Sequence, residues 1–237
     1  MDSSHRRPLL TQSEEQVKAE FQGISSVPFS DIGIRRHGRL PHWEKECGLY
    51  FVTFRTYDSL PKDVFKNAPP SLFHGRRGLR QREIEQLLDR GTGSPLFADP
   101  RCASLVAESL RGASAKYRLI AWCVMPNHIH FIARLLPGVT LADVMHSLKS
   151  FTAKRINKLL SRTGPVWQRE YYDRLIRDAD EFRRAVTYVV KNPEKAGLKN
   201  WIWVEDLSGM EQNERERDAP ATVGETPTPL DSFRRNE

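Results

Sequence analysis

The order of strand and helix patterns predicts an α+β fold, a small antiparallel sheet of ferredoxin-like type with helices packed on one face. Three observations favour this class. The patterns follow the order β-α-α-β-β-α-(β)-α, which lacks the strict alternation of a parallel sheet. The middle two strand patterns are separated only by Pro126-Asn127, which predicts a tight antiparallel connection. The first strand pattern, LYFVTFR at 49–55, is rich in aromatic and β-branched residues.

The first half of this order contains one strand and two helices. The strand over 49–55 is ended by Leu60-Pro61. Apolar residues at helical spacing predict a helix over 78–89, and Gly and Pro residues then mark a loop. Asp99-Pro100 predicts the start of a second helix that runs to about Arg111, because proline suits the first helical position.

The second half begins with the strands 117–125 and 128–135. Thr140, with Asp143 three residues later, predicts the cap of a helix over 141–160. An extended stretch over 166–176 precedes a last helix.

The last helix is expected to be capped by Asp178 or Asp180 and to stop near Asn192, because Pro193 follows. The apolar piece 198–204 is expected to pack back as a strand or turn.

Charge divides the chain into three parts. Residues 1–38 hold five basic and five acidic side chains and lack sustained periodicity, which predicts a flexible arm. Residues 205–237 hold four basic and nine acidic side chains and predict a disordered acidic tail. The predicted domain, 39–204, therefore holds 28 of the 37 basic and 16 of the 30 acidic side chains. A body with a net charge of +12 favours a polyanionic partner, although a solvated arginine-rich surface would give the same number.

Other features of the sequence argue against a membrane protein, a secreted protein and a protein held together by disulfides or zinc. The longest apolar run, Leu119–Met125, is too short to span a bilayer, and the N-terminus lacks an apolar signal core. The cysteines Cys47, Cys102 and Cys123 form no CxxC pair, which disfavours a disulfide framework and a zinc knuckle. These observations favour a cytoplasmic, nucleoid-associated protein with no membrane contact.

Two histidines on one predicted strand are candidate metal ligands. His128 and His130 are two residues apart, so their side chains project to the same side, while Ile129, Phe131 and Ala133 face the core. Two neutral imidazoles on a rigid strand form half of a metal site. A bare HxH pattern is also common on polar sheet faces, so a third ligand is needed to support a metal site.

The last helix offers further candidates beside its buried stripe. Arg184, Tyr188 and Asn192 are spaced by one helical turn and lie at the edge of that stripe. Tyr188 could act as a nucleophile, and Asn192 could supply an oxygen ligand to a hard divalent ion. Taken alone, the same residues are better explained as a packing tyrosine and a helix-terminal asparagine.

Three strings in order carry a resemblance to a known family. They read VMPNHIHFIARL, WQREYYDRLIRD and FRRAVTYVVKNPEKAGL, and LPHWE with YFVTFR precedes them. Over about residues 38–200 the chain resembles the single-tyrosine HUH transposases, and among these the REP-associated tyrosine transposases. It departs from the smallest members in its longer 61–115 region, its arm and its tail.

The resemblance implies a reaction and a role for each candidate. His128 and His130 would hold Mg²⁺ or Mn²⁺ on the scissile phosphate of single-stranded DNA beside a hairpin, and Asn192 would be the third ligand. Tyr188 would attack the phosphorus and leave a 5′-phosphotyrosine and a free 3′-OH. A tyrosine hydroxyl has a pKa of about 10, so nearby positive charge must favour the phenolate. Members of the family act as monomers or homodimers.

Two alternatives remain open for the nucleophile and the reaction. Tyr171 and Tyr172 are rival nucleophiles, although packing or base stacking also explains them. A non-catalytic DNA-binding module of the same fold, or a nuclease that uses water, would share the basic surface. That surface is expected to include Lys149, Lys154, Arg155, Lys158, Arg169, Arg174, Arg177, Arg183 and Arg184.

Overall fold

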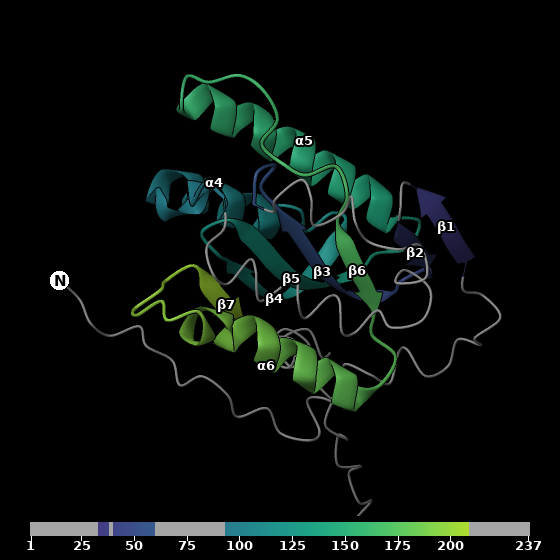
Figure 1. Ribbon diagram of the computed structural model, residues 1–237. Helices are drawn as coiled ribbons and strands as arrows, with labels where there is room; N and C mark the ends of the chain where they lie inside the picture. Colours follow the sequence, from purple (N-terminus) through teal and green to yellow (C-terminus); the bar gives the residue numbers. More distant parts are fainter. Residues whose placement is uncertain (1–32, 38–39, 60–92, 209–237) are drawn as a thin grey trace, which may run out of the picture.

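The computed structural model describes residues 33–37, 40–59 and 93–208 (Figure 1). The helix predicted over 78–89, most of the arm and most of the tail lie outside these residues. Strands β1 (Gly33–His37) and β2 (Leu40–Glu44) form an antiparallel hairpin. The hairpin begins within the segment that the sequence predicts as an arm.

A five-stranded antiparallel sheet forms the centre of the molecule. Its order is β6-β3-β5-β4-β7, so β3 and β4 are not neighbours although they are consecutive in the chain. This is the β-α-β-β-α-β arrangement of a ferredoxin-like unit, extended by β7 at one edge. The predicted fold class is confirmed. The strands are β3 (Leu49–Arg55), β4 (Tyr117–Val124), β5 (His128–Leu135), β6 (Tyr172–Leu175) and β7 (Val204–Asp206).

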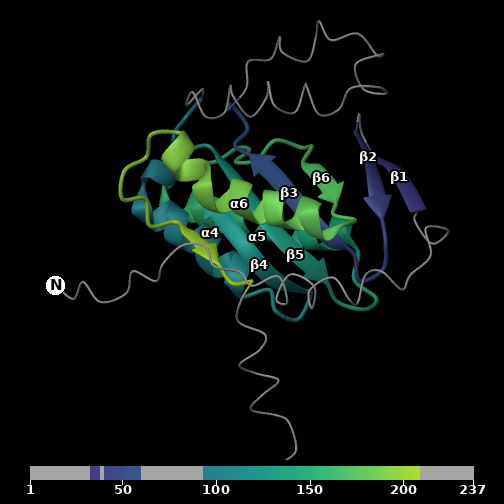
Figure 2. The ribbon, with the colours of Figure 1, turned by 90° about the horizontal axis from the view of Figure 1, so that it is seen from below.

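Helices cover both faces of this sheet, which corrects the prediction that they pack on one face. Helices α4 (Pro100–Arg111) and α5 (Leu141–Leu159) lie on one side, and α6 (Ala179–Lys195) lies on the other (Figures 1 and 2). The physical reason is that β3 is buried at every position and β5 at all but one. A strand that is apolar or buried on both sides requires a cover on each side.

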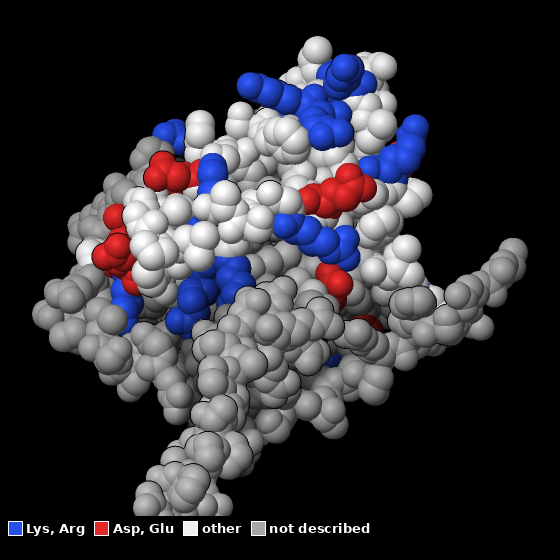
Figure 3. Space-filling model, turned by 180° about the vertical axis from the view of Figure 1, so that it is seen from behind, with Lys and Arg blue, Asp and Glu red and all other residues white. Residues whose placement is uncertain are grey.

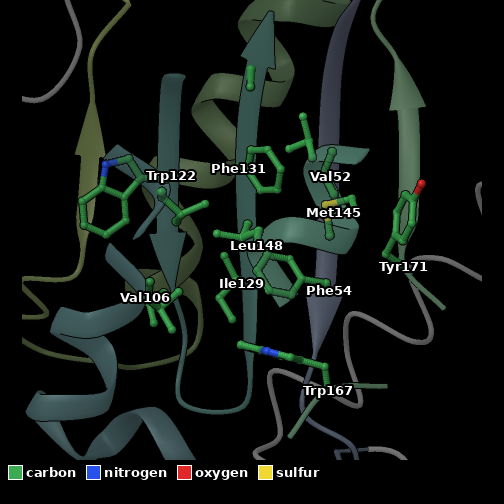
Figure 4. Close-up of a cluster of buried hydrophobic side chains, with 14 of the residues drawn as sticks. Val52, Phe54, Val106, Trp122, Ile129, Phe131, Met145, Leu148, Trp167 and Tyr171 are labelled. Atoms are coloured by element: carbon green, nitrogen blue, oxygen red, sulfur yellow. The ribbon is translucent and has the colours of Figure 1, made fainter. Parts of the chain in front are cut away.

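The larger core lies between the sheet and helices α4 and α5. Figure 4 shows Phe54 and Phe131 from neighbouring strands packed in this layer with Trp167. The ring centroids of Phe54 and Trp167 are 4.7 Å apart. A second cluster, which includes Phe51, Ile132 and the α6 side chains Phe182 and Val186, fills the opposite layer. The odd and even residues of each strand thus supply separate cores.

The predicted helix starts are confirmed in detail. Thr140 Oγ1 accepts a hydrogen bond from the Asp143 backbone N–H at 3.2 Å at the start of α5. Of the two candidates for α6, Asp178 is the cap, and its carboxylate accepts from the Glu181 N–H at 2.7 Å.

The predicted end of α6 near Asn192 is wrong, because the helix continues through Pro193 to Lys195. A proline removes one N–H donor, and in the last turn that loss is tolerated. The turn is closed instead by the Ala196 N–H, which donates to the Asn192 carbonyl at 3.0 Å. Asn192 therefore lies inside the helix, where it is fully buried.

The β1–β2 hairpin is joined to the sheet through polar contacts. The Tyr50 hydroxyl of β3 donates to the Trp43 carbonyl of β2 at 3.0 Å. His42 Nδ1 and Asp173 Oδ1 are hydrogen-bond partners, and both side chains are almost completely buried. The Tyr171 ring lies 4.6 Å from the His42 ring.

Among the described helices, none is both long and apolar enough to cross a bilayer.

The capping of α6 can be tested by removing one carboxylate. We expect Asp178→Ala to lower the free energy of unfolding by about 1 kcal/mol, because the Glu181 N–H loses its acceptor. Asp180→Ala is the control, since Asp180 is exposed and pairs only with the exposed Arg183. Urea unfolding of both variants gives the comparison, and equal losses would contradict the assignment of the cap.

Candidate metal and nucleophile site

The two histidines share the face of the sheet that α6 covers. In the β3–β5 register, Thr53 is opposite His130 and Arg55 is opposite His128. Ile129, Phe131 and Ala133 point into the core on the other face, as the alternation predicts. Both histidines are fully buried. The pair is thus held on β5, a central strand of the sheet, rather than on a loop.

Hydrogen bonds fix the orientation of both rings. Asn127 Oδ1 lies 2.7 Å from His128 Nδ1, and because an amide oxygen only accepts, that nitrogen carries the hydrogen. His128 Nε2 therefore keeps its lone pair, and it lies 3.0 Å from His130 Nε2. Thr53 Oγ1 lies 2.8 Å from His130 Nδ1. A hydroxyl can donate or accept, so Thr53 suits either tautomer of His130.

Both imidazoles are held in the neutral form. Burial, together with the smaller effect of the nearby positive charge of Arg55, lowers the pKa of His128 from 6.5 to about 3. Burial and the neighbouring His128 place the pKa of His130 well below its usual value. Neutral imidazole is the form that binds a metal. When Thr53 Oγ1 accepts a hydrogen bond from His130 Nδ1, the Nε2 atoms of both histidines keep their lone pairs and can act as two ligands of one cation.

Tyr188 lies directly beside this pair. Its ring centroid is 5.2 Å from that of His130, in an edge arrangement, and 5.7 Å from that of Phe51. Lys195, two turns further along α6, places its ammonium 5.3 Å from the centre of the Tyr188 ring. The Tyr188 hydroxyl is itself buried. The helix thus brings together a phenol, a cation and the two histidines.

Asn192 is one helical turn beyond Tyr188 and is completely buried. Neither its amide oxygen nor its amide nitrogen has a hydrogen-bond partner among the described residues. A buried amide without partners is costly unless a ligand satisfies it. Within the same residues, no group of three or more His, Cys, Asp and Glu side chains could hold a metal. Imidazole nitrogens and amide oxygens are donors that divalent cations accept, and Asn192 lies one turn of α6 beyond the tyrosine whose ring contacts His130.

The rival tyrosines, Tyr171 just before β6 and Tyr172 at its start, lie on opposite faces of the sheet. Tyr171 packs in the core between the sheet and helices α4 and α5, on the face away from the histidines. Tyr172 lies on the α6 side, with its ring 6.4 Å from Phe51. The structure thus brings Tyr188 into ring contact with His130 and places Tyr171 on the far side of the sheet.

The predicted DNA-binding residues do not form one group. Lys154, Arg155 and Lys158 are on α5, in the layer opposite the histidines, and basic side chains gather over this part of the surface (Figure 3). The Lys149 ammonium is turned inward, where it donates to the Gln168 and Arg169 carbonyls at 2.6 and 2.8 Å.

The remaining predicted DNA contacts are near α6 or on the loop before β6. Arg174 and Arg177 both pair with Glu181, while Arg183 and Arg184 are exposed on α6. Arg183 contacts Asp180, and Arg169 is exposed on the loop before β6.

Sequence reasoning missed the partners of the histidines. Thr53, Arg55 and Asn127 all surround the pair. Asn127 could have been found, since it directly precedes His128. Thr53 and Arg55 become neighbours only through the pairing of β3 with β5, which separates them from the histidines by more than seventy positions. For Thr53 and Arg55 the available signal was the alternation of apolar and polar residues in the VTFR string at 52–55, which puts both polar side chains on one face of the strand.

Part of the chain is similar to a known protein family. The model of the family described as "Transposase IS200 like" matches residues 98–192, which include the histidines, Tyr188 and Asn192. This segment is similar to the IS200-like transposases.

Two individual proteins are also similar to the chain. A curated Haemophilus influenzae protein named as a REP-associated tyrosine transposase is 26% identical over 99 residues, which cover 36% of this chain and 56% of that protein. The chain thus spans about half the length of that relative. A solved REP-associated tyrosine transposase bound to a REP hairpin is 16% identical with a TM-score of 0.42, and covers 84% of this chain and 98% of its own.

Burial of the histidines predicts a specific loss of stability in acid. Below pH 6.5 the His128 ring is protonated in the unfolded chain but stays neutral in the folded chain, where its pKa is about 3. The stability is present above pH 6.5 and is lost as the pH falls, by up to about 1.4 kcal/mol per pH unit for each histidine. Urea unfolding in EDTA at pH 7, 6 and 5 measures this slope. His128→Gln should flatten it, and an unchanged slope would contradict the burial of a neutral ring.

Proposed function

We propose that this protein is an IS200-like transposase that cleaves and rejoins single-stranded DNA through a covalent bond to Tyr188. The observation that carries the proposal is the ring contact between Tyr188 and His130, which brings the only predicted nucleophile on α6 to the histidine pair. A tyrosine that served packing alone would need no such neighbours. The convergence joins an amino acid that can attack phosphorus to residues that can hold a cation.

The proposed step conserves one phosphodiester bond. The Tyr188 oxygen attacks the phosphorus and loses its proton, while the bond from phosphorus to the 3′ oxygen breaks. The 3′ oxygen gains a proton and leaves as a 3′-OH, and the 5′ side remains as a phosphotyrosine. Because the bond is conserved, the 3′-OH of another strand can reverse the step without ATP. Lys195 lies over the Tyr188 ring, where its charge favours the developing phenolate.

His128, His130 and Asn192 are the residues that would hold Mg²⁺ or Mn²⁺. The bound cation would stabilise the added negative charge on the phosphate oxygens. The unsatisfied amide of Asn192 and the facing Nε2 atoms of the histidines support this assignment. Thr53 and Asn127 would orient the two rings from behind.

The substrate class follows from charge and family. The net charge of +12 over 39–204 suits a nucleic acid. The family resemblance points to single-stranded DNA with a hairpin near the cut, and the protein would act as a monomer or a homodimer. Because both histidines are fully buried beneath α6, a phosphate reaches them only when that helix shifts.

An adduct assay tests the nucleophile. The full chain is incubated with a library of single-stranded hairpin oligonucleotides and Mn²⁺, and a protein–DNA species that survives SDS is measured. We expect the adduct in the wild type and its loss in Tyr188→Phe and His128→Ala, because the first removes the attacking oxygen and the second a ligand. Tyr172→Phe is the matched control and should keep the adduct. An adduct that persists in Tyr188→Phe would overturn the proposal, and binding without any adduct would favour a DNA-binding module.

Metal affinity tests the ligand set independently of DNA. We expect Asn192→Ala to weaken Mn²⁺ binding, because an amide oxygen is lost from the site. Thr53→Val keeps the shape of the side chain but removes the partner of His130 Nδ1, and we expect a 10- to 100-fold loss of affinity. Calorimetric titration of the apoprotein measures both constants. Thr56→Val, also buried but bonded to the Asn127 carbonyl, should change affinity less, and an equal loss would contradict the role of Thr53.

A further inference from the structure

The outer side of helix α5 carries an exposed aromatic ring among positive charges. Phe151 is 50% exposed, whereas the apolar stripe of the same helix is buried. Lys154, Arg155 and Lys158 follow it at three, four and seven positions and are also exposed, so the four side chains share one side of the helix. The Arg155 guanidinium lies 5.3 Å from the centre of the Phe151 ring, a cation–π contact. Together these four residues form the α5 surface.

Carboxylates do not balance the positive charge of the α5 surface. Residues 144–169 include six Lys and Arg side chains and no Asp or Glu. Within the part of the chain that the structure describes, none of the three cations of the α5 surface forms an ion pair. Exposed arginines elsewhere do pair, as Arg111 does with Glu205 and Arg183 with Asp180. The α5 surface therefore suits an anion from outside the chain.

The setting of Phe151 distinguishes it from the other exposed apolar side chains. Among the described residues the other large ones are Tyr57, Leu159 and Ile202. A single exposed apolar residue is ordinary and needs no ligand. Of these four residues, Phe151 is the one whose ring lies under a cation. An aromatic ring between cations is the arrangement with which proteins bind single-stranded nucleic acid.

We propose that the α5 surface binds an unpaired stretch of the DNA substrate, with one base stacked on Phe151 and the neighbouring phosphates at the three cations. The choice of DNA as the partner rests on the proposed function. A ring can stack on a base only where one face of that base is free, and the bases within a duplex cover one another. Cations along one side of a helix can contact successive phosphates of such a strand. Because α5 and α6 cover opposite faces of the sheet, this contact holds the strand away from the phosphate that Tyr188 attacks.

Binding in EDTA tests the aromatic ring apart from any chemistry. The full chain is titrated with a single-stranded oligothymidylate and with an abasic strand of equal length, which has the same phosphates and no bases. We expect Phe151→Ala to weaken binding of the oligothymidylate about tenfold and to leave the abasic strand nearly unaffected, because the ring contacts only the base. Phe151→Trp should keep the wild-type affinity. Leu159→Ala removes an exposed apolar side chain from the same helix, and as the matched control it should change neither constant.

The salt dependence of the same binding tests the cations. Each phosphate contact on a single strand contributes about 0.7 to the slope of log affinity against log salt concentration. We expect Lys158→Gln to reduce this slope by about 0.7 on both strands, and Phe151→Ala to leave it unchanged. Thermal unfolding of each variant confirms that it is folded.

The results separate this inference from the proposed function. If Phe151→Ala binds the oligothymidylate like the wild type, or loses as much affinity for the abasic strand or for a duplex, the inference is wrong. An adduct at Tyr188 would still support the proposed function in each of these cases. If the base-dependent loss is found but the wild type forms no adduct with any hairpin, the inference holds and the proposed function fails.

Discussion

The register between β3 and β5 is the constraint on which the site depends. Thr53 faces His130 and Arg55 faces His128 in this pairing. Because side chains alternate along a strand, a slip by one residue would turn the histidines into the aromatic core and bring Phe131 under α6. The apolar side chains on the α4–α5 face oppose that slip. The same burial that stabilises the fold thus holds the polar groups of the site in place.

Helix α6 completes the site and also closes it. Its apolar stripe, which includes Phe182 and Val189, packs on the sheet, and Tyr188 and Asn192 are carried beside that stripe. The continuation of the helix through Pro193 is essential to this arrangement. If the helix ended at Asn192, that amide would sit at a frayed terminus and water would satisfy it. Inside the last turn it is buried without a hydrogen-bond partner among the described residues, which is why we propose it as a ligand.

Local patterns in the sequence predicted most of the fold, and the failures share one cause. Alternation identified the strands, and Thr140 and Asp178 marked the helix starts that the structure confirms. The cover on the second face was missed, because a helical stripe shows that a helix is buried but not against which side of a sheet. Likewise HxH spacing predicted that the histidines point the same way. Thr53 and Arg55 could not be predicted, since only long-range pairing makes them neighbours.

The two halves of the proposed activity lie in different layers, and one short segment connects them. The basic side chains of α5 lie on the face opposite Tyr188, so a DNA strand that touches both must pass around an end of the sheet. Residues 168–170 lie at such an end. Lys149 of α5 donates to carbonyls of this segment, and Glu170 interacts with Arg55 beside the histidines. This segment therefore contacts helix α5 in one layer and the neighbour of the histidines in the other.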